Sequence, residues 1–80
     1  MDIPRIFFDS NAGPPGGDRY GLWFDNSKTD LAKIPGGPKE GMRVVIYVTG
    51  ELEMQAILAF DVEWGWTAKP IPGTVQTLNE

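Results

Sequence analysis

The chain has 80 residues, of which 41% are hydrophobic, and its seven basic and eleven acidic side chains give a formal net charge of −4. It contains neither cysteine nor histidine, which excludes disulfides, thiolate and imidazole metal sites, and catalytic relays of the Ser-His-Asp type. The length predicts a single domain over residues 1–80, with enough apolar content for a core but modest stability.

The first 24 residues predict two short strands separated by a loop. Residues 3–8 form an apolar run of usual strand length, and residues 20–24 form a second one. Between them, residues 11–17 hold two prolines and three glycines, a composition typical of loops. We therefore expect residues 1–19 to be partly irregular, with a Gly/Pro-rich loop at 11–17.

A short helix is predicted next. Ser27 is a residue type that caps helix N-termini, and Asp30 follows at the position where a carboxylate can bond back to the backbone of the first turn. Pro35 disfavours helical backbone at the residue before it, so the helix should end by Ile34.

Two strands joined by a tight turn are predicted from residue 42 to residue 60. Residues 42–48 are rich in β-branched and aromatic types and are apolar on both faces, as in a central strand. Gly50 supplies the turn. Residues 52–60 alternate between apolar and mixed positions, which indicates a half-buried strand. A helix is the competing interpretation because Leu, Glu, Met, Gln and Ala favour helix, but the alternation and the preceding turn favour a strand.

The remaining residues continue the same pattern of strand and turn. Residues 61–65 form a turn, residues 66–69 a third strand that ends at Pro70, and residues 74–78 a short last strand after the turn at 71–73. The strands at 42–48, 52–60 and 66–69 should form one contiguous antiparallel sheet. Its inward side chains should be those of Val44, Ile46, Met54, Ala56, Leu58 and Trp66.

This succession of strands resembles that of SH3-like barrels over most of the chain. Residues 41–45 are similar to the entry of the second barrel strand, 51–60 to the long bent third strand, 66–68 to the fourth, and 72–78 to the short crossing and final strand. The stretch also resembles small bacterial proteins of unknown function with this architecture. The resemblance implies an all-β fold: a small SH3-like barrel of five to six short antiparallel strands with one short helical turn.

The resemblance does not extend to the binding of proline-rich peptides. SH3 domains with that function carry a paired-Tyr motif in the first strand and a paired-Trp motif at the start of the third. Here the nearest pair, Trp64 and Trp66, is split by Gly65 and lies one strand later. A barrel fold alone does not assign a function.

Carboxylate pairs are the catalytic option that the composition leaves. Glu51 and Glu53 share a strand face at a spacing of roughly 7 Å, which carboxylate pairs of glycosidases use. Charges on a solvated strand face explain them better. A calcium loop starting at Asp9 fails because Pro14 stands where glycine is required. The Gly-rich segments 13–17 and 36–41 lack the spacing of a phosphate loop. We therefore predict no catalytic residue, no metal site and no cofactor.

The turn at 61–65 is the candidate binding surface. Trp64 lies out of the inward register of Trp66, and Asp61 and Glu63 flank it with negative charge. An exposed Trp there could grip a basic or peptide partner, with Tyr47 as the second aromatic within reach. The alternative is that Trp64 folds over the end of the barrel and caps the core.

The preferred function is a non-enzymatic protein-interaction module that binds another protein or its own copy. The alternative is a small oligomeric enzyme with an active site formed between subunits. The N-terminal residues show no basic region followed by an apolar stretch, and no segment has the length of a membrane span. We therefore expect a cytoplasmic protein without a membrane partner.

Nucleic-acid binding is predicted to be absent, because phosphate contacts draw on clustered Lys and Arg. This chain is acidic and has no two adjacent basic residues. A fluorescence anisotropy titration with generic DNA and RNA oligonucleotides at physiological salt should detect no tight binding. A micromolar or stronger dissociation constant would contradict the charge argument.

Overall fold

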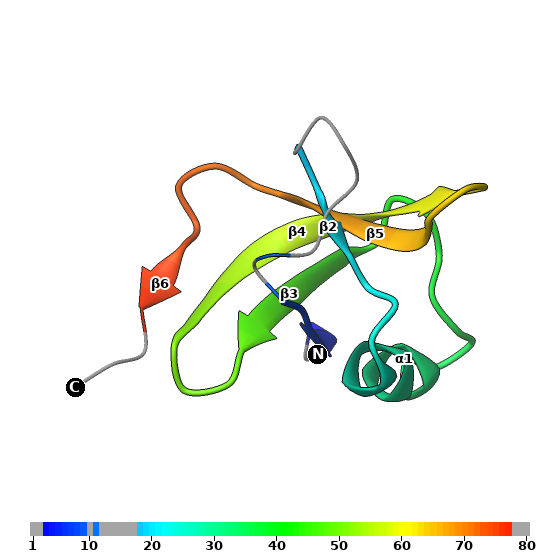
Figure 1. Ribbon diagram of the computed structural model, residues 1–80, viewed down its shortest axis with the longest axis horizontal. Coiled ribbons are helices and arrows are strands. Elements are labelled where there is room, and N and C mark those ends of the chain that lie inside the picture. Colours follow the sequence, from blue (N-terminus) through cyan, green and yellow to red (C-terminus); the bar gives the residue numbers. More distant parts are fainter. Residues whose placement is uncertain (1–2, 10, 12–17, 78–80) are drawn as a thin grey trace.

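The computed structural model describes residues 3–9, 11 and 18–77. The chain forms a small all-β fold with one short helix, and its sheet curls into half a barrel (Figure 1). The elements in chain order are β1 (Arg5–Phe7), β2 (Tyr20–Gly21), α1 (Asp25–Ala32), β3 (Arg43–Val48), β4 (Leu52–Asp61), β5 (Gly65–Pro70) and β6 (Gln76–Thr77). The expectation of a small barrel-like all-β fold is confirmed.

The centre of the sheet is the predicted antiparallel meander β3–β4–β5. Arg43 lies opposite Ile57 in the β3–β4 pair, and Ile57 lies opposite Lys69 in the β4–β5 pair. The helical alternative for residues 52–60 is wrong, since they lie within the ten-residue strand β4. The length of β4 lets it pair with β5 along its second half and with β6 near its start.

The strands β1 and β2 close the two edges of the sheet, in the order β1–β3–β4–β5–β2. The pairing of β1 with β3 is parallel, which differs from the antiparallel arrangement expected for every strand. The reason is topological. Between β1 and β3 the chain crosses to the far edge as β2 and returns through α1, and a crossover of this kind delivers the next strand in parallel.

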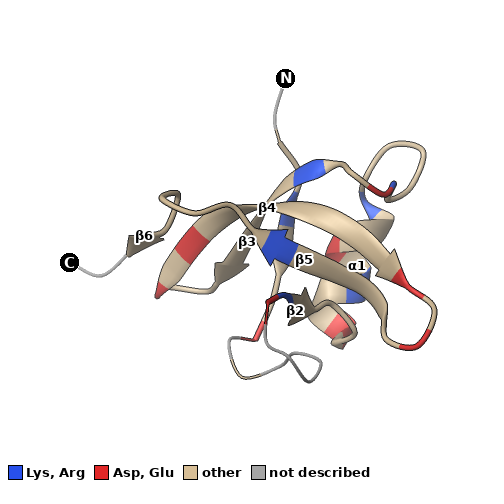
Figure 2. Ribbon diagram, turned by 90° about the horizontal axis from the view of Figure 1, so that it is seen from above, with Lys and Arg blue, Asp and Glu red and all other residues tan. Residues whose placement is uncertain are grey.

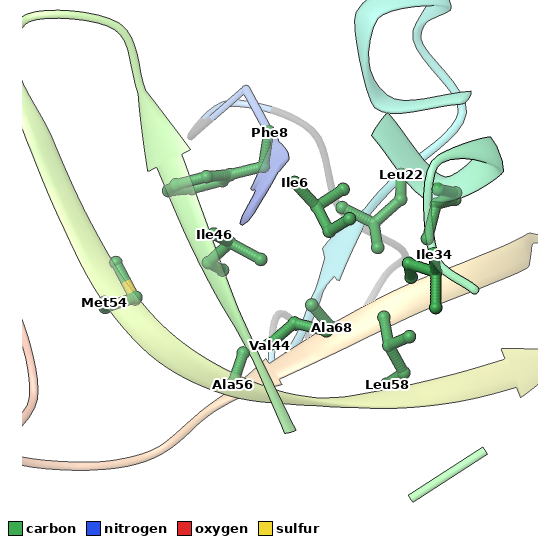
Figure 3. Packing of buried hydrophobic residues seen from close by; sticks show 11 residues of the cluster. Ile6, Phe8, Leu22, Ile34, Val44, Ile46, Met54, Ala56, Leu58 and Ala68 are labelled. Carbon is green, nitrogen blue, oxygen red and sulfur yellow. The ribbon is translucent and has the colours of Figure 1, made fainter. Parts of the chain in front are cut away.

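The core lies on the face of the sheet that α1 covers (Figure 3). Five of the six predicted inward residues of β3–β5 are buried, and the sixth, Trp66, is partly buried against the same cluster. Side chains from β1, β2 and the helix region complete it. The buried hydrophobic residues are Ile6, Phe8, Leu22, Leu31, Ile34, Val44, Ile46, Met54, Ala56, Leu58 and Ala68.

The start of α1 differs from the prediction. The N-cap residue is Phe24, which makes no side-chain cap, and Ser27 lies inside the first turn, fully buried. The Ser27 hydroxyl donates to the Phe7 carbonyl (2.5 Å), and the Asp30 carboxylate accepts from the Phe7 N–H (3.0 Å). The two polar residues therefore bind a distant strand edge rather than the helix's own first turn. The predicted end of the helix is confirmed, as it stops at Ala32.

The C-terminal end of the described chain is exposed and pairs only briefly with the sheet. The last strand, β6, has two exposed residues, Gln76 and Thr77, and lies apart from the helix at the far end of β4 (Figure 1). Most of the predicted loop at 11–17 and the last residue of the predicted strand at 74–78 lie outside the described residues. Among the described residues, no helix combines the length and apolar character required to cross a membrane.

Leu58 provides the test of the core. It is fully buried in the middle of β4, so Leu58→Ala should lower the free energy of unfolding by about 2–5 kcal/mol, the range for core leucines. Val62→Ala is the control, because Val62 is 97% exposed and its truncation should change stability by no more than about 0.5 kcal/mol. Urea unfolding followed by fluorescence measures both. Equal effects of the two substitutions would contradict the core assignment.

Candidate functional site

The β4–β5 turn has its shape set by Asp61. One oxygen of this carboxylate, Oδ1, accepts from the N–H groups of Glu63 (2.7 Å) and Trp64 (3.0 Å). Gly65 then takes a φ of 79°, a left-handed conformation that favours glycine. The turn is thus held by its own hydrogen bonds, and it presents its side chains from a defined backbone.

Trp64 is 38% exposed and packs on a second indole, that of Trp23, with ring centroids 5.6 Å apart and planes tilted by 33°. The Trp23 ring lies directly over Gly21 in β2, where a Cβ would come within 1.8 Å of it. Trp64 is therefore neither freely exposed nor part of the core. It rests on a base of Trp23 and Gly21 and keeps part of its surface in solvent.

Two apolar side chains that precede Trp64 in the sequence are also exposed. Val62, at the middle of the turn, is 97% exposed, and Phe60 is 50% exposed while its ring meets Trp66 edge-on with a centroid distance of 5.3 Å. We call Asp61, Val62, Glu63 and Trp64 the turn surface; Phe60 points to the core face of β4, as Leu58 does two residues earlier. Exposed apolar residues that cluster between polar ones are typical of interaction sites.

Charge at the turn surface is mostly negative. Figure 2 shows acidic colouring at the end of β4 and in the turn that follows it. The guanidinium of Arg19 approaches Asp61, with Nη1 4.0 Å from Oδ2, and it also contacts Asp18 at 3.3 Å. Asp61 thus uses one oxygen to hold the turn and offers the other to a cation.

Tyr47 does not belong to the turn surface. It lies opposite Glu53 in the β3–β4 pair, eight residues along β4 from Asp61, or roughly 26 Å of strand. The prediction that Tyr47 reaches the turn is therefore wrong in the folded chain, whereas Trp64, Asp61 and Glu63 do lie together. Its hydroxyl instead reaches α1, where it donates to Asp30 Oδ2 (2.9 Å).

A polar cluster surrounds Tyr47. The Arg5 guanidinium lies 5.1 Å from the centre of the Tyr47 ring and binds the Glu53 carboxylate at 2.8 Å. Burial raises the pKa of the Tyr47 hydroxyl, and the hydrogen bond to Asp30 raises it further, while the Arg5 charge acts in the opposite direction. Local sequence patterns do not reveal this cluster, because its members come from β1, α1, β3 and β4.

The remaining candidates from the sequence gain no support in the part of the chain that the structure describes. Glu53 is paired with Arg5, and Glu51 lies exposed in the preceding turn, so the two do not act as an isolated carboxylate pair. Two open clefts of about 330 and 200 Å³ lie beside the C-terminal segment and beside the end of α1, and residues of the turn surface line neither. Within residues 3–9, 11 and 18–77, no three acidic side chains gather closely enough to hold a metal ion.

Comparison with known proteins returns no matching family model, no matching curated protein and no matching solved structure. The resemblance to SH3-like barrels therefore stays a prediction.

The Tyr47–Asp30 contact predicts alkaline destabilisation. Because folding raises the pKa of Tyr47 above its ordinary value of 10.0, the unfolded chain loses this proton first as the pH rises. The stabilisation of the folded state by the Tyr47–Asp30 hydrogen bond is therefore complete below about pH 9, and it is lost as the pH rises through the folded-state pKa of Tyr47. Tyr47→Phe lacks this hydrogen bond. Its free energy of unfolding at pH 7 should therefore be lower by about 0.5–1.5 kcal/mol, the usual range for one hydrogen bond.

Urea unfolding of both chains between neutral and strongly alkaline pH checks this expectation. The stability difference between wild type and Tyr47→Phe should shrink at alkaline pH. A difference spectrum that places the tyrosinate transition of Tyr47 below that of a free tyrosine would contradict it.

Proposed function

We propose that this chain is a non-enzymatic protein-interaction module that docks onto another protein chain through the turn surface. The single observation that carries the proposal is the exposure of Val62 and Trp64 on a turn held by its own hydrogen bonds. An apolar residue that is 97% exposed contributes little to folding, whereas it gains free energy when a partner removes it from water.

The packing of Trp64 on Trp23 also favours a role in binding. Its indole is held in place by Trp23, so little side-chain freedom remains to be lost on binding. Tryptophan is among the residues enriched at the energetic centres of protein interfaces. Binding residues also concentrate on loops that a rigid scaffold positions, which is the relation of this turn to the sheet.

The acidic side chains define the chemistry of the partner. Asp61 and Glu63 favour a surface that offers Lys or Arg around an apolar centre. Arg19 of the same chain shows that such a contact fits, since its guanidinium lies 4.0 Å from the Oδ2 oxygen of Asp61. We therefore expect the partner to present a basic surface with an exposed apolar group.

Trp64→Ala tests the proposal. An immobilised wild-type chain should retain partner proteins from a lysate of the source cell, and mass spectrometry identifies them. The amount that the variant retains should be lower by about tenfold or more. The lost contact between the two indoles should cost about 0.5–1.5 kcal/mol beyond the area that Trp64 buries, so circular dichroism must first show that the variant folds.

Val75→Ala is the matched control, because Val75 is also exposed but lies outside the turn surface. It should retain the same proteins as wild type. Equal retention by wild type and Trp64→Ala, with both chains folded, would contradict the proposal.

A further inference from the structure

The sheet face opposite the core carries a basic row. Arg43, Ile57 and Lys69 lie directly opposite one another on β3, β4 and β5, so their side chains share one face. This is the outer face, because the neighbours Val44, Ala56 and Leu58 point into the core. Arg43 and Lys69 are both exposed and flank the half-buried Ile57. We call Arg43, Ile57 and Lys69 the basic row.

The opposite end of the same hairpin carries the reverse pattern. Val62, almost fully solvated, stands between Asp61 and Glu63 in the turn surface. Asp61 lies four residues beyond Ile57 along β4, or about 13 Å of strand. Figure 2 shows the separation, with basic colouring near the end of β5 and acidic colouring at the end of β4 and in the turn.

The middle of the hairpin face offers no charge. Ala59 and Thr67 face each other between the two ends. Thr67 is fully buried within the single chain, opposite Gly21 and the Trp23 ring that covers Gly21, and its hydroxyl donates to the Ala59 carbonyl (3.0 Å). Ala59 is half-buried and apolar. A second protein surface can therefore cover the half-exposed Ala59 without leaving a polar side chain unpaired.

We propose that the partner of the turn surface is a second copy of this chain, and this inference rests on the proposed function. Two copies pair through the outer faces of their β4–β5 hairpins, antiparallel about a two-fold axis near Ala59. Each turn surface then lies against the basic row of the other copy. Val62 meets Ile57, and Glu63 meets Lys69.

The charge arrangement is the reason for choosing a second copy over other partners. One face of one hairpin holds both an acidic end and a basic end around small side chains, so the face is complementary to itself when turned by 180°. Two-fold contacts of this kind are the commonest in homo-oligomers. The pairing also removes from water an exposed valine that the single chain leaves solvated.

Charge reversal tests the pairing by sedimentation equilibrium at low salt. Glu63→Lys and Lys69→Glu should each raise the dimer dissociation constant by about tenfold or more, because each places like charges together in both halves of the contact. An equimolar mixture of the two single variants should dimerise again. In that mixed dimer the introduced lysine of one copy faces the introduced glutamate of the other, and the native Glu63 faces the native Lys69. The double variant Glu63→Lys/Lys69→Glu should also dimerise.

Glu51→Lys is the control, as it makes the same charge change at an exposed position in the turn at the other end of β4. It should leave dimerisation unchanged. Wild-type association should weaken at high salt, where exposed charges are screened. A wild-type chain that stays monomeric at about 1 mM and low salt would overturn the inference, as would single variants that dimerise as well as wild type.

The two proposals fail separately. If the chain stays monomeric but loses captured proteins on Trp64→Ala, the proposed function stands and the partner is not a second copy. If the charge-reversal pattern holds but Trp64→Ala captures other proteins as well as wild type does, the turn surface serves self-pairing alone.

Discussion

The arrangement of this domain depends on how the main chain of Phe7 is satisfied. Phe7 sits in the edge strand β1, and β3 bonds the chain on either side of it, at the Pro4 carbonyl and the Phe8 N–H. Its own N–H and carbonyl point away from the sheet and are bound by Asp30 and Ser27 of α1. An unpaired edge invites association with other strands. Here two side chains take the place of a further strand, and the same contacts hold the helix over the core.

The contacts of this edge are long-range, and such contacts are the part of the fold that sequence patterns do not predict. The strands β3, β4 and β5 were predicted closely because their signals are local: alternation along each strand and glycine or proline in each turn. The role of Ser27 cannot be predicted from such signals, since a serine near a helix start suits both a local cap and a distant carbonyl. Its actual partner is 20 residues away. Parallel pairing of β1 depends likewise on the path of the whole chain, which no local pattern encodes.

The same distinction divides the candidate site. Trp64, Asp61 and Glu63 were found together because they share one turn, whose shape follows from Asp61 and Gly65. The place of Tyr47 cannot be predicted in the same way, because its distance from the turn depends on the register and length of β4. The basic row is hidden from sequence patterns for a related reason. Its three residues lie far apart in the sequence and meet only when both hairpin registers are known.

Gly21 gives the turn surface a distant point of control. The Trp23 ring occupies the space that a side chain at position 21 would need, and Trp64 rests on that ring. Any substitution at Gly21 must displace Trp23 and with it the support of Trp64. A change more than forty residues earlier in the chain would thereby alter a surface that it does not touch. A substitution at a buried glycine can therefore change the exposed surface of the β4–β5 turn while every exposed residue keeps its identity.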